Sequence, residues 1–304
     1  MRRTFVIFYT AREGSSAIIH QLSGQRDIVV PVFEGLDRYA FRRHFAADDL
    51  IHAVDLALAK GEFAADSGAE ARMLAQRHPE QSVDTVDCIG FKWRPHGDPA
   101  QMTEVFKRNN TTVFLLFRRD FAELVASLIV SAHIKKSGNG GRITHHQFWY
   151  RNAPSQERDR MRQHAESVRI ALNRSEILQT AVKRVALAFR IRRYAERVAR
   201  GGVPMHVIYY EDFLRDPVSF LQGVKTTLAL EQPFERARGK EFEKMTTMPA
   251  TERIIQFEEF LSTAPMRVLA RAYAGQLARA ERLASGERGS AVDAAFASAL
   301  KRPN

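Results

Sequence analysis

The sequence TFVIFYTAREGSSAIIHQL, residues 4 to 22, changes its pattern twice. Thr4 to Tyr9 is rich in β-branched and aromatic residues, which is typical of a buried strand. Ala11 to Ser16 is small and polar, and Ala17 to Leu22 has apolar residues at helical spacing. The segment therefore predicts a strand, a loop and a helix in succession.

The rest of the chain repeats this alternation. The run DIVVPVF at 27–33 follows at the distance expected for a parallel strand–helix–strand crossover. Further strands are predicted at 87–93, 111–117 and 205–210, and an amphipathic helix is predicted at 175–200. This order predicts an α/β fold, with a mainly parallel sheet flanked by helices.

Length and composition favour a single compact unit over residues 1–304. The chain is 45% hydrophobic, enough for a sizeable core, and contains no repeat or low-complexity linker. Residues 135–152, KKSGNGGRITHHQFWYRN, are first rich in glycine and then aromatic. We expect this insertion to form an acceptor pocket or a lid.

The charge balance favours anionic partners. Forty-six Lys and Arg residues against 35 Asp and Glu give a formal charge of +11. The basic residues are dispersed and no nucleic-acid motif accompanies them, so we expect no nucleic-acid partner. The apolar run from Thr4 to Thr10 is too short for a signal or membrane segment. Cys88 is the only cysteine, which excludes an intrachain disulfide and fits a reducing cytoplasm.

The first loop, Arg12-Glu13-Gly14-Ser15-Ser16, has the outline of a phosphate cradle. Glycine followed by small hydroxyl residues at a helix N-terminus lets backbone N–H groups approach an anion closely. The loop lacks the G-x-x-x-x-G-K-[ST] pattern of kinases and ATPases, which supplies a lysine and a magnesium-binding hydroxyl. Taken alone, the same turn also fits an ordinary loop.

A second pair of residues strengthens this interpretation. The predicted strand at 111–117 leads into Arg118-Arg119-Asp120, and Ser127 follows eight residues after Arg119. This spacing allows an arginine at the mouth of the turn to converge with a hydroxyl two helical turns onward. An arginine and a hydroxyl together suit a phosphate monoester.

These motifs make the chain similar to the sulfotransferases that use 3′-phosphoadenosine 5′-phosphosulfate (PAPS), in particular their bacterial carbohydrate-type members. Residues 12–16 resemble the family's [K/R]-S-G-[ST]-[ST] loop, and Arg119 with Ser127 resembles its second signature. The segment VIYYEDFLRDP at 207–217 resembles the family's Y-E-D-L-x-x-D-P element. Residues 244–260, KMTTMPATERIIQFEEF, resemble the late segment that packs beside the nucleotide.

The resemblance implies a nucleotide-kinase-like sulfotransferase fold, PAPS as cosubstrate, 3′-phosphoadenosine 5′-phosphate (PAP) as product, and a hydroxyl acceptor of carbohydrate type. The loop at 12–16 would hold the 5′-phosphosulfate, with Arg12 stabilising charge in the reaction. Arg119 and Ser127 would hold the 3′-phosphate, and Lys244 and Thr246 would lie beside the nucleotide. Two positions depart from the pattern: Glu13 replaces a small hydroxyl residue, and the usual proline after Arg119 is missing.

Two residues compete for the role of general base. Glu34 follows the second predicted strand, 22 residues after Arg12, and resembles the catalytic glutamate of carbohydrate-type members. His96 lies in Arg94-Pro95-His96, which resembles the Lys-x-His of the small-molecule branch. The resemblance to the carbohydrate type favours Glu34. Lys92 and Arg94, at the end of the strand at 87–93, either contact acceptor or sulfate or are ordinary strand-end charges.

We expect no metal cofactor, because the ten histidines show no H-E-x-x-H or Cys-His pattern. Other classes of function stay open. A non-catalytic relative would bind PAP without transferring a group, and a P-loop-like kinase would need magnesium and ATP. A polyanion-binding module would bind in a salt-dependent manner, regardless of adenosine phosphates.

Overall fold

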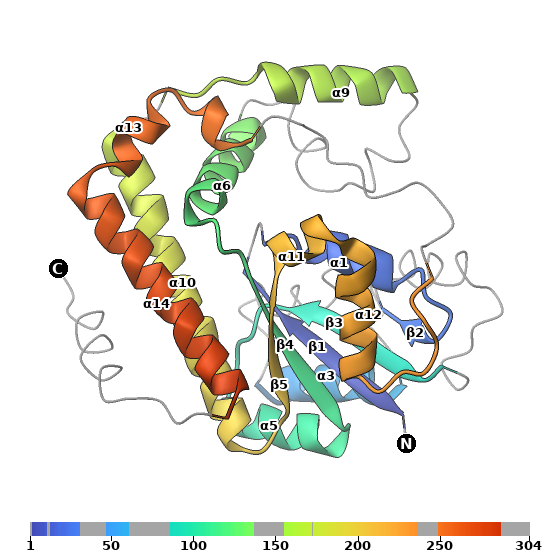
Figure 1. The fold of residues 1–304 in the computed structure, drawn as a ribbon. Coiled ribbons are helices and arrows are strands. Elements are labelled where there is room, and N and C mark those ends of the chain that lie inside the picture. The colour runs from blue at the N-terminus through green and yellow to red at the C-terminus, as the bar shows by residue number, and fades with distance from the viewer. Residues whose placement is uncertain are drawn as a thin grey trace.

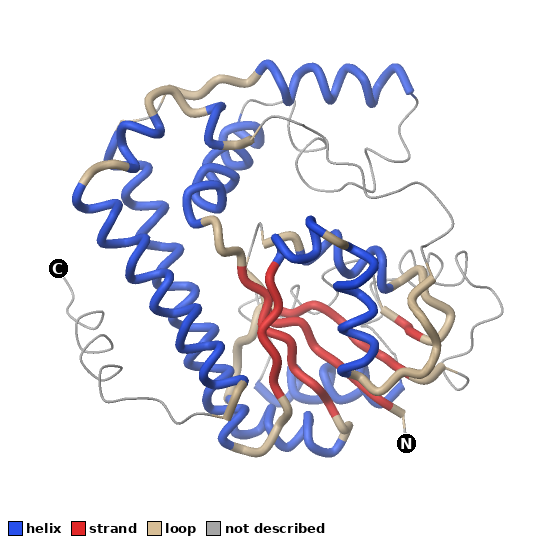
Figure 2. The backbone as a smooth tube through the Cα atoms, in the orientation of Figure 1, coloured by secondary structure: helices blue, strands red, loops and turns tan. Residues whose placement is uncertain are grey.

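The computed structural model describes residues 2–10, 13–30, 47–60, 86–136, 155–171, 173–235 and 249–286. Within these residues five strands form one sheet in which every pairing is parallel. They are β1 (Arg3–Phe8), β2 (Ile28–Val29), β3 (Cys88–Trp93), β4 (Thr111–Phe117) and β5 (Met205–Tyr209). The predicted α/β fold with a parallel sheet flanked by helices is confirmed (Figure 2).

The strand order, β2-β3-β1-β4-β5, determines where a ligand site can form. The chain leaves β1 towards β2 and β3 on one side, and it leaves β4 towards β5 on the other. In open parallel sheets, ligands bind where neighbouring strands diverge in this way, beyond their carboxyl ends. The loops after β1 and β4 are therefore the expected site.

The two faces of the sheet bury alternate residues of each strand. On one face, Phe5, Ile7 and Tyr9 pack with α1 (Ser15–Leu22), α11 (Tyr210–Arg215) and α12 (Pro217–Thr227). On the other face, Val6 and Phe8 pack with α3 (Ala47–Lys60) and α5 (Pro99–Arg108). The result is a three-layer arrangement with the sheet in the middle (Figure 1).

The second face is extended by a pair of long helices. α10 (Arg174–Arg200) packs along α14 (Ala264–Ala284), and the side chain of Arg192 on α10 donates a hydrogen bond to Gln276 on α14. Figure 1 shows the two helices side by side along one flank of the sheet. The remaining described elements are α6 (Phe121–Lys136), α9 (Ser155–Ser167), the 3₁₀ helix η2 (Thr251–Arg253) and α13 (Phe257–Leu261).

Local sequence explains why several helices begin where they do. Asp98 accepts hydrogen bonds from the N–H groups of Ala100 and Gln101, and Pro99 occupies the first position of α5. Asp216 and Pro217 open α12 in the same way, with Asp216 capping the N–H of Ser219. Lys135 and Lys136 end α6, so the first two residues of the insertion predicted at 135–152 belong to this helix, and residues 137–152 lie outside the described residues.

Candidate functional site

Gly14 shapes the loop between β1 and α1. Its φ is +82°, in the left-handed region that suits glycine, and it caps the N-terminus of α1. A Cβ on Gly14 would lie 2.1 Å from Cδ2 of Tyr210, so the ring of Tyr210 packs directly against the loop. Backbone conformation and packing both require glycine here.

Ser15 and Ser16 open α1 directly after Gly14, with Ser15 buried and Ser16 exposed. The first N–H groups of a helix have no intrahelical acceptor, and the helix dipole adds positive potential at that end. The described part of the loop, from Glu13 onward, thus leads through a left-handed glycine into a helix N-terminus, which is the form of backbone that an anion cradle requires. Anion binding by these residues stays a prediction.

Lys92 brings a positive charge to this cradle from the neighbouring strand. Its side chain is only 4% exposed, and its Nζ donates a hydrogen bond of 2.8 Å to Oγ of Ser16. The Nζ of Lys92 and the guanidinium carbon of Arg94 both lie 5.4 Å from the centre of the Tyr9 ring. Two cations at the end of β3 therefore lie near the Tyr9 ring, and one of them, Lys92, contacts the first turn of α1.

The carboxylate of Glu13 faces the interior of the protein. Glu13 is 1% exposed, and its Oε2 accepts a hydrogen bond of 2.5 Å from the N–H of Thr10, which closes the loop across its base. Burial raises the pKa of Glu13, while the charges of Arg184 and Arg118 and the bond from Thr10 act in the opposite direction. Glu13 thus lies within electrostatic reach of Arg184 on α10 and of Arg118 directly after β4, and its bond to Thr10 holds the loop from the interior side.

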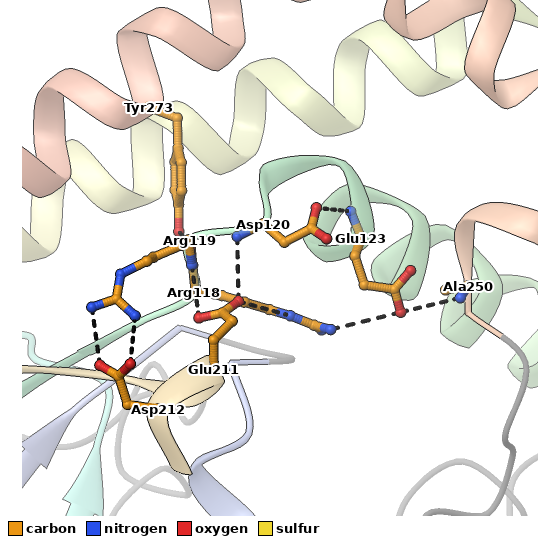
Figure 3. Close-up of polar contacts among 8 residues, drawn as sticks. All are labelled: Arg118, Arg119, Asp120, Glu123, Glu211, Asp212, Ala250 and Tyr273. Carbon is orange, nitrogen blue, oxygen red and sulfur yellow. Dashed lines mark hydrogen bonds and ion pairs between the residues drawn. The ribbon is translucent and has the colours of Figure 1, made fainter. Parts of the chain in front are cut away.

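The turn between β4 and α6 is fixed by partners from two distant helices, as Figure 3 shows. The carboxylate of Glu211 accepts from the backbone N–H groups of Arg119 (3.0 Å) and Asp120 (3.3 Å). The hydroxyl of Tyr273, on α14, donates to the carbonyl of Arg118 over 2.8 Å. These bonds hold the turn in the absence of the proline that the family pattern has after Arg119.

The guanidinium of Arg119 is directed towards α11. It makes two parallel hydrogen bonds with the carboxylate of Asp212, of 2.8 and 2.9 Å, and lies 3.7 Å from the ring centre of Tyr209. The bonds to Asp212 raise the pKa of Arg119, and the bonds from Arg119 lower the pKa of Asp212. Arg119 is therefore charged, oriented and 46% exposed, and its binding of an anion stays a prediction.

Ser127 lies in the second turn of α6, one turn beyond Glu123 and on the same face. The carboxylate of Glu123 accepts from the N–H groups of Ala250 and Thr251, both over 3.1 Å, and lies 3.6 Å from Arg118. This face of α6 is therefore turned towards η2, whereas Arg119 is turned towards α11. Convergence of Arg119 and Ser127 on one phosphate stays a prediction.

A hydrogen bond to the backbone determines the tautomer of His96. Its Nδ1 lies 2.8 Å from the carbonyl oxygen of Arg94, which can only accept, so Nδ1 carries the proton and Nε2 the lone pair. The ring packs against Trp93 with 5.2 Å between centroids, and burial lowers the pKa of His96. His96 is thus neutral at neutral pH. Its Nε2 is buried, so an acceptor would need to displace neighbouring groups to reach it.

Several predicted site residues lie outside the described residues. They are Arg12, Glu34, Lys244 and Thr246, together with residues 137–152 of the predicted insertion. Their roles stay predictions.

Four partners of the site were missed by sequence reasoning: Arg118, Arg184, Glu211 and Tyr273. The sequence contained an indication for Arg184. This residue falls between Ala181 and Val185 on the apolar face of the long helix, where an arginine is unexpected unless it has a buried partner. Lys92 carried a similar signal, since it interrupts the otherwise apolar strand CIGFKW.

None of the helices in the described residues combines the length and the apolar character needed to cross a membrane. Among the same residues, no group of three or more His, Cys, Asp or Glu side chains is placed to hold a metal ion.

The fold and site define an α/β protein with a basic, glycine-shaped helix N-terminus at the carboxyl edge of a parallel sheet. No protein-family model matches the chain, and no curated protein matches it. One similar solved structure is a sulfotransferase from Alicyclobacillus acidocaldarius, at 15% sequence identity and a TM-score of 0.46. The match covers 97% of this chain and 99% of that one.

Proposed function

We propose that this protein is a sulfotransferase that moves a sulfuryl group from PAPS to an acceptor hydroxyl and releases PAP. The proposal is carried by the hydrogen bond from Lys92 to Ser16, which brings a buried cation to the first turn of α1. The loop lacks the lysine of a kinase P-loop, and β3 supplies a lysine in its place. N–H groups, hydroxyls and a cation together suit the 5′-phosphosulfate of PAPS.

The two loops at the sheet edge would hold the two ends of the nucleotide. Arg12, Lys92 and the backbone N–H groups of Gly14, Ser15 and Ser16 would bind the phosphosulfate. Arg119 and Ser127 would bind the 3′-phosphate, and Lys244 and Thr246 would lie beside the nucleotide. Glu13 belongs to the same loop and would act by holding it in place.

The chemistry requires little covalent participation by the protein. The acceptor oxygen forms a bond to sulfur, while the bond between sulfur and the bridging phosphate oxygen breaks. Its electron pair leaves with PAP. The acceptor proton passes to a base, Glu34 or His96. By analogy with phosphoryl transfer, catalysis consists of positioning and of stabilising charge on the leaving oxygen. Arg12 and Lys92 would provide that charge.

The acceptor class follows from the family resemblance. We propose a carbohydrate or glycan-like hydroxyl, which agrees with Glu34 as the base. If His96 is the base, small phenols and alcohols become the expected acceptors. The single, buried Cys88 is compatible with the cytoplasm, where we propose that the protein acts.

The decisive experiment compares adenosine phosphates by thermal shift and calorimetry. PAP should stabilise the protein more than ADP or AMP, because Arg119 has a 3′-phosphate to bind only in PAP. At a concentration about 100-fold above its dissociation constant, PAP should add roughly 2.7 kcal/mol to the free energy of unfolding. Equal stabilisation by AMP and PAP would overturn the proposal. An acceptor screen with labelled PAPS then separates an enzyme from a non-catalytic PAP-binding relative.

Metal dependence tests the alternative of a P-loop-like kinase. The loop lacks the G-K-[ST] end of the kinase pattern, in which the lysine binds phosphate and the hydroxyl after it binds magnesium, so sulfuryl transfer should proceed equally well in a chelator. Activity that disappears in a chelator and returns with magnesium and ATP would favour the kinase.

A further inference from the structure

Arg119 is engaged at the part of its side chain that a phosphate would use. Nη1 and Nη2 of Arg119 donate to the two carboxylate oxygens of Asp212, over 2.8 and 2.9 Å (Figure 3). A phosphate monoester takes the same paired geometry from a guanidinium. Asp212 and a 3′-phosphate therefore need the same donors, and both are negatively charged.

The position of Arg119 does not depend on Asp212 alone. Its guanidinium lies 3.7 Å from the ring centre of Tyr209, and that ring is held in turn by a 2.6 Å hydrogen bond from its hydroxyl to Glu281. The backbone N–H of Arg119 is bound by Glu211 over 3.0 Å. Arg119 would thus keep its place and direction if Asp212 moved or lost its charge.

Asp212 also has a second cation within reach. Nη2 of Arg215 lies 2.5 Å from Oδ1 of Asp212, one helical turn further along α11. All three side chains are accessible to solvent, with 46% of Arg119, 34% of Asp212 and 74% of Arg215 exposed. Asp212 can therefore leave Arg119 for Arg215 without entering the interior or being left unpaired.

We propose that Asp212 is a built-in competitor for the 3′-phosphate on Arg119, and that Arg215 receives Asp212 when the phosphate binds. This inference rests on the proposed function, in which Arg119 anchors PAPS and PAP. Asp212 would lower the affinity of the protein for both PAPS and PAP, and it would thereby favour release of the product PAP. It is a specificity-determining residue, because it acts only on ligands that carry a 3′-phosphate.

The test compares PAP and AMP binding to the Asp212→Asn variant and to the wild type by calorimetry. Asparagine keeps the shape of Asp212 but removes the charge that competes with phosphate. We expect PAP to bind roughly fivefold more tightly, as the loss of one exposed ionic contact predicts, with AMP binding unchanged. Product inhibition by PAP should strengthen by the same factor. Weaker PAP binding by Asp212→Asn would overturn the inference, because it would make Asp212 a simple support for Arg119.

Two further variants sharpen the result. Arg215→Met removes the alternative partner of Asp212 and should weaken PAP binding, whereas a simple supporting role of Asp212 predicts no loss. Asp216→Asn is the control, because it also removes one negative charge, four residues beyond Asp212, from a carboxylate that caps α12. It should leave the ratio of PAP to AMP affinity unchanged. Tighter PAP binding in both Asp212→Asn and Asp216→Asn would show a general charge effect and overturn the inference. A wild type that binds PAP and AMP equally would instead overturn the proposed function.

Discussion

Nζ of Lys92 lies 2.8 Å from Oγ of Ser16, so a buried lysine of β3 is bonded to the first turn of α1. Lys92→Met keeps the apolar stem of this side chain and removes its charge. If Lys92 faces the phosphosulfate, PAP and PAPS affinity should fall about 10- to 100-fold, the usual loss for a hydrogen bond to a charged group. Lys107→Met, on the exposed surface of α5, is the control. Unchanged nucleotide affinity in Lys92→Met would contradict the proposed role.

The tight packing of Tyr210 on Gly14 predicts an unequal outcome for two glycine variants. Gly14 and Gly202 both have positive φ, of +82° and +90°, so alanine strains the backbone at each by about 1–2 kcal/mol. The space around Gly202 is open, whereas a Cβ on Gly14 meets the ring of Tyr210. Gly14→Ala should therefore lose more stability in chemical unfolding, and only Gly14→Ala should weaken PAP binding. Equal losses of stability in Gly14→Ala and Gly202→Ala would show that Tyr210 does not pack tightly against Gly14.

The buried Glu13 predicts an unusual dependence of stability on pH. Burial raises the pKa of Glu13 above its ordinary value of 4.5, despite the nearby charges of Arg184 and Arg118. The folded state therefore favours the protonated carboxyl. The contribution of Glu13 to stability is fully present below pH 4.5 and is lost as the pH rises through the raised pKa.

Unfolding free energies of the wild type and Glu13→Gln, measured from pH 4 to pH 8, check this sign. The wild type should lose stability relative to Glu13→Gln as the pH rises. Asp212→Asn offers a comparison of opposite sign, because the bonds from Arg119 lower the pKa of Asp212. The wild type should lose stability relative to that variant as the pH falls below about 4. A flat difference between wild type and Glu13→Gln would mean that Glu13 titrates normally.

Lys225 and Asp27 form an ion pair whose side chains are each only 1% exposed, with 2.8 Å between Nζ and Oδ2. Lys225→Met should lower the unfolding free energy by about 3–5 kcal/mol, because it leaves a buried carboxylate without its cation. The double variant with Asp27→Asn should recover much of this loss. Since Asp27 precedes β2, the pair lies away from the carboxyl edge of the sheet, and PAP affinity should not change. Urea unfolding of the single and double variants measures these free energies, and a double variant no more stable than Lys225→Met would contradict the prediction.

The choice between the two candidate bases is a kinetic question. A general base contributes about 10² to 10⁴ to the rate, so Glu34→Gln should lose roughly that factor while PAP binding is kept. His96→Asn should lose less than about tenfold. The opposite order would assign the base to His96, whose tautomer is already suitable. Turnover at saturating PAPS, with PAP affinity measured in parallel, distinguishes the two.

Sequence patterns predicted the sheet well because each strand is a short apolar run between polar turns. The run at 111–117 matches β4 at both ends, and the helix predicted at 175–200 begins one residue early as α10. Of the strand predicted at 27–33, the described residues 27–30 include a paired strand at Ile28 and Val29, and residues 31–33 lie outside the described ranges. Local patterns determine elements of this kind, and tertiary contacts adjust their ends.

The partners of the site were less accessible to sequence reasoning. Glu13 and Arg184, or Arg119 and Asp212, are distant along the chain, and no local pattern shows that they meet. The sequence indicated that a carboxylate is unexpected at position 13 of a phosphate-binding loop. Only the fold shows that the charge of Arg184 acts on Glu13. The direction of Arg119 likewise depends on Tyr209 and α11, which lie beyond the reach of the eight-residue spacing to Ser127.

The position of β1 in the middle of the sheet has a consequence for how the chain folds. Of the five described strands β1 is synthesised first, yet Thr4 pairs with Thr111 on β4, 107 positions away, and the pairing of Val113 on β4 with Met205 on β5 spans 92. Closing loops of this length before any pairing is gained makes folding slow. Until β3 and β4 emerge from the ribosome, the apolar strand β1 lacks both of the strands with which it pairs. Fragments that end before residue 117 should therefore aggregate, and the nascent chain should depend on chaperones for longer than a helical protein of equal size.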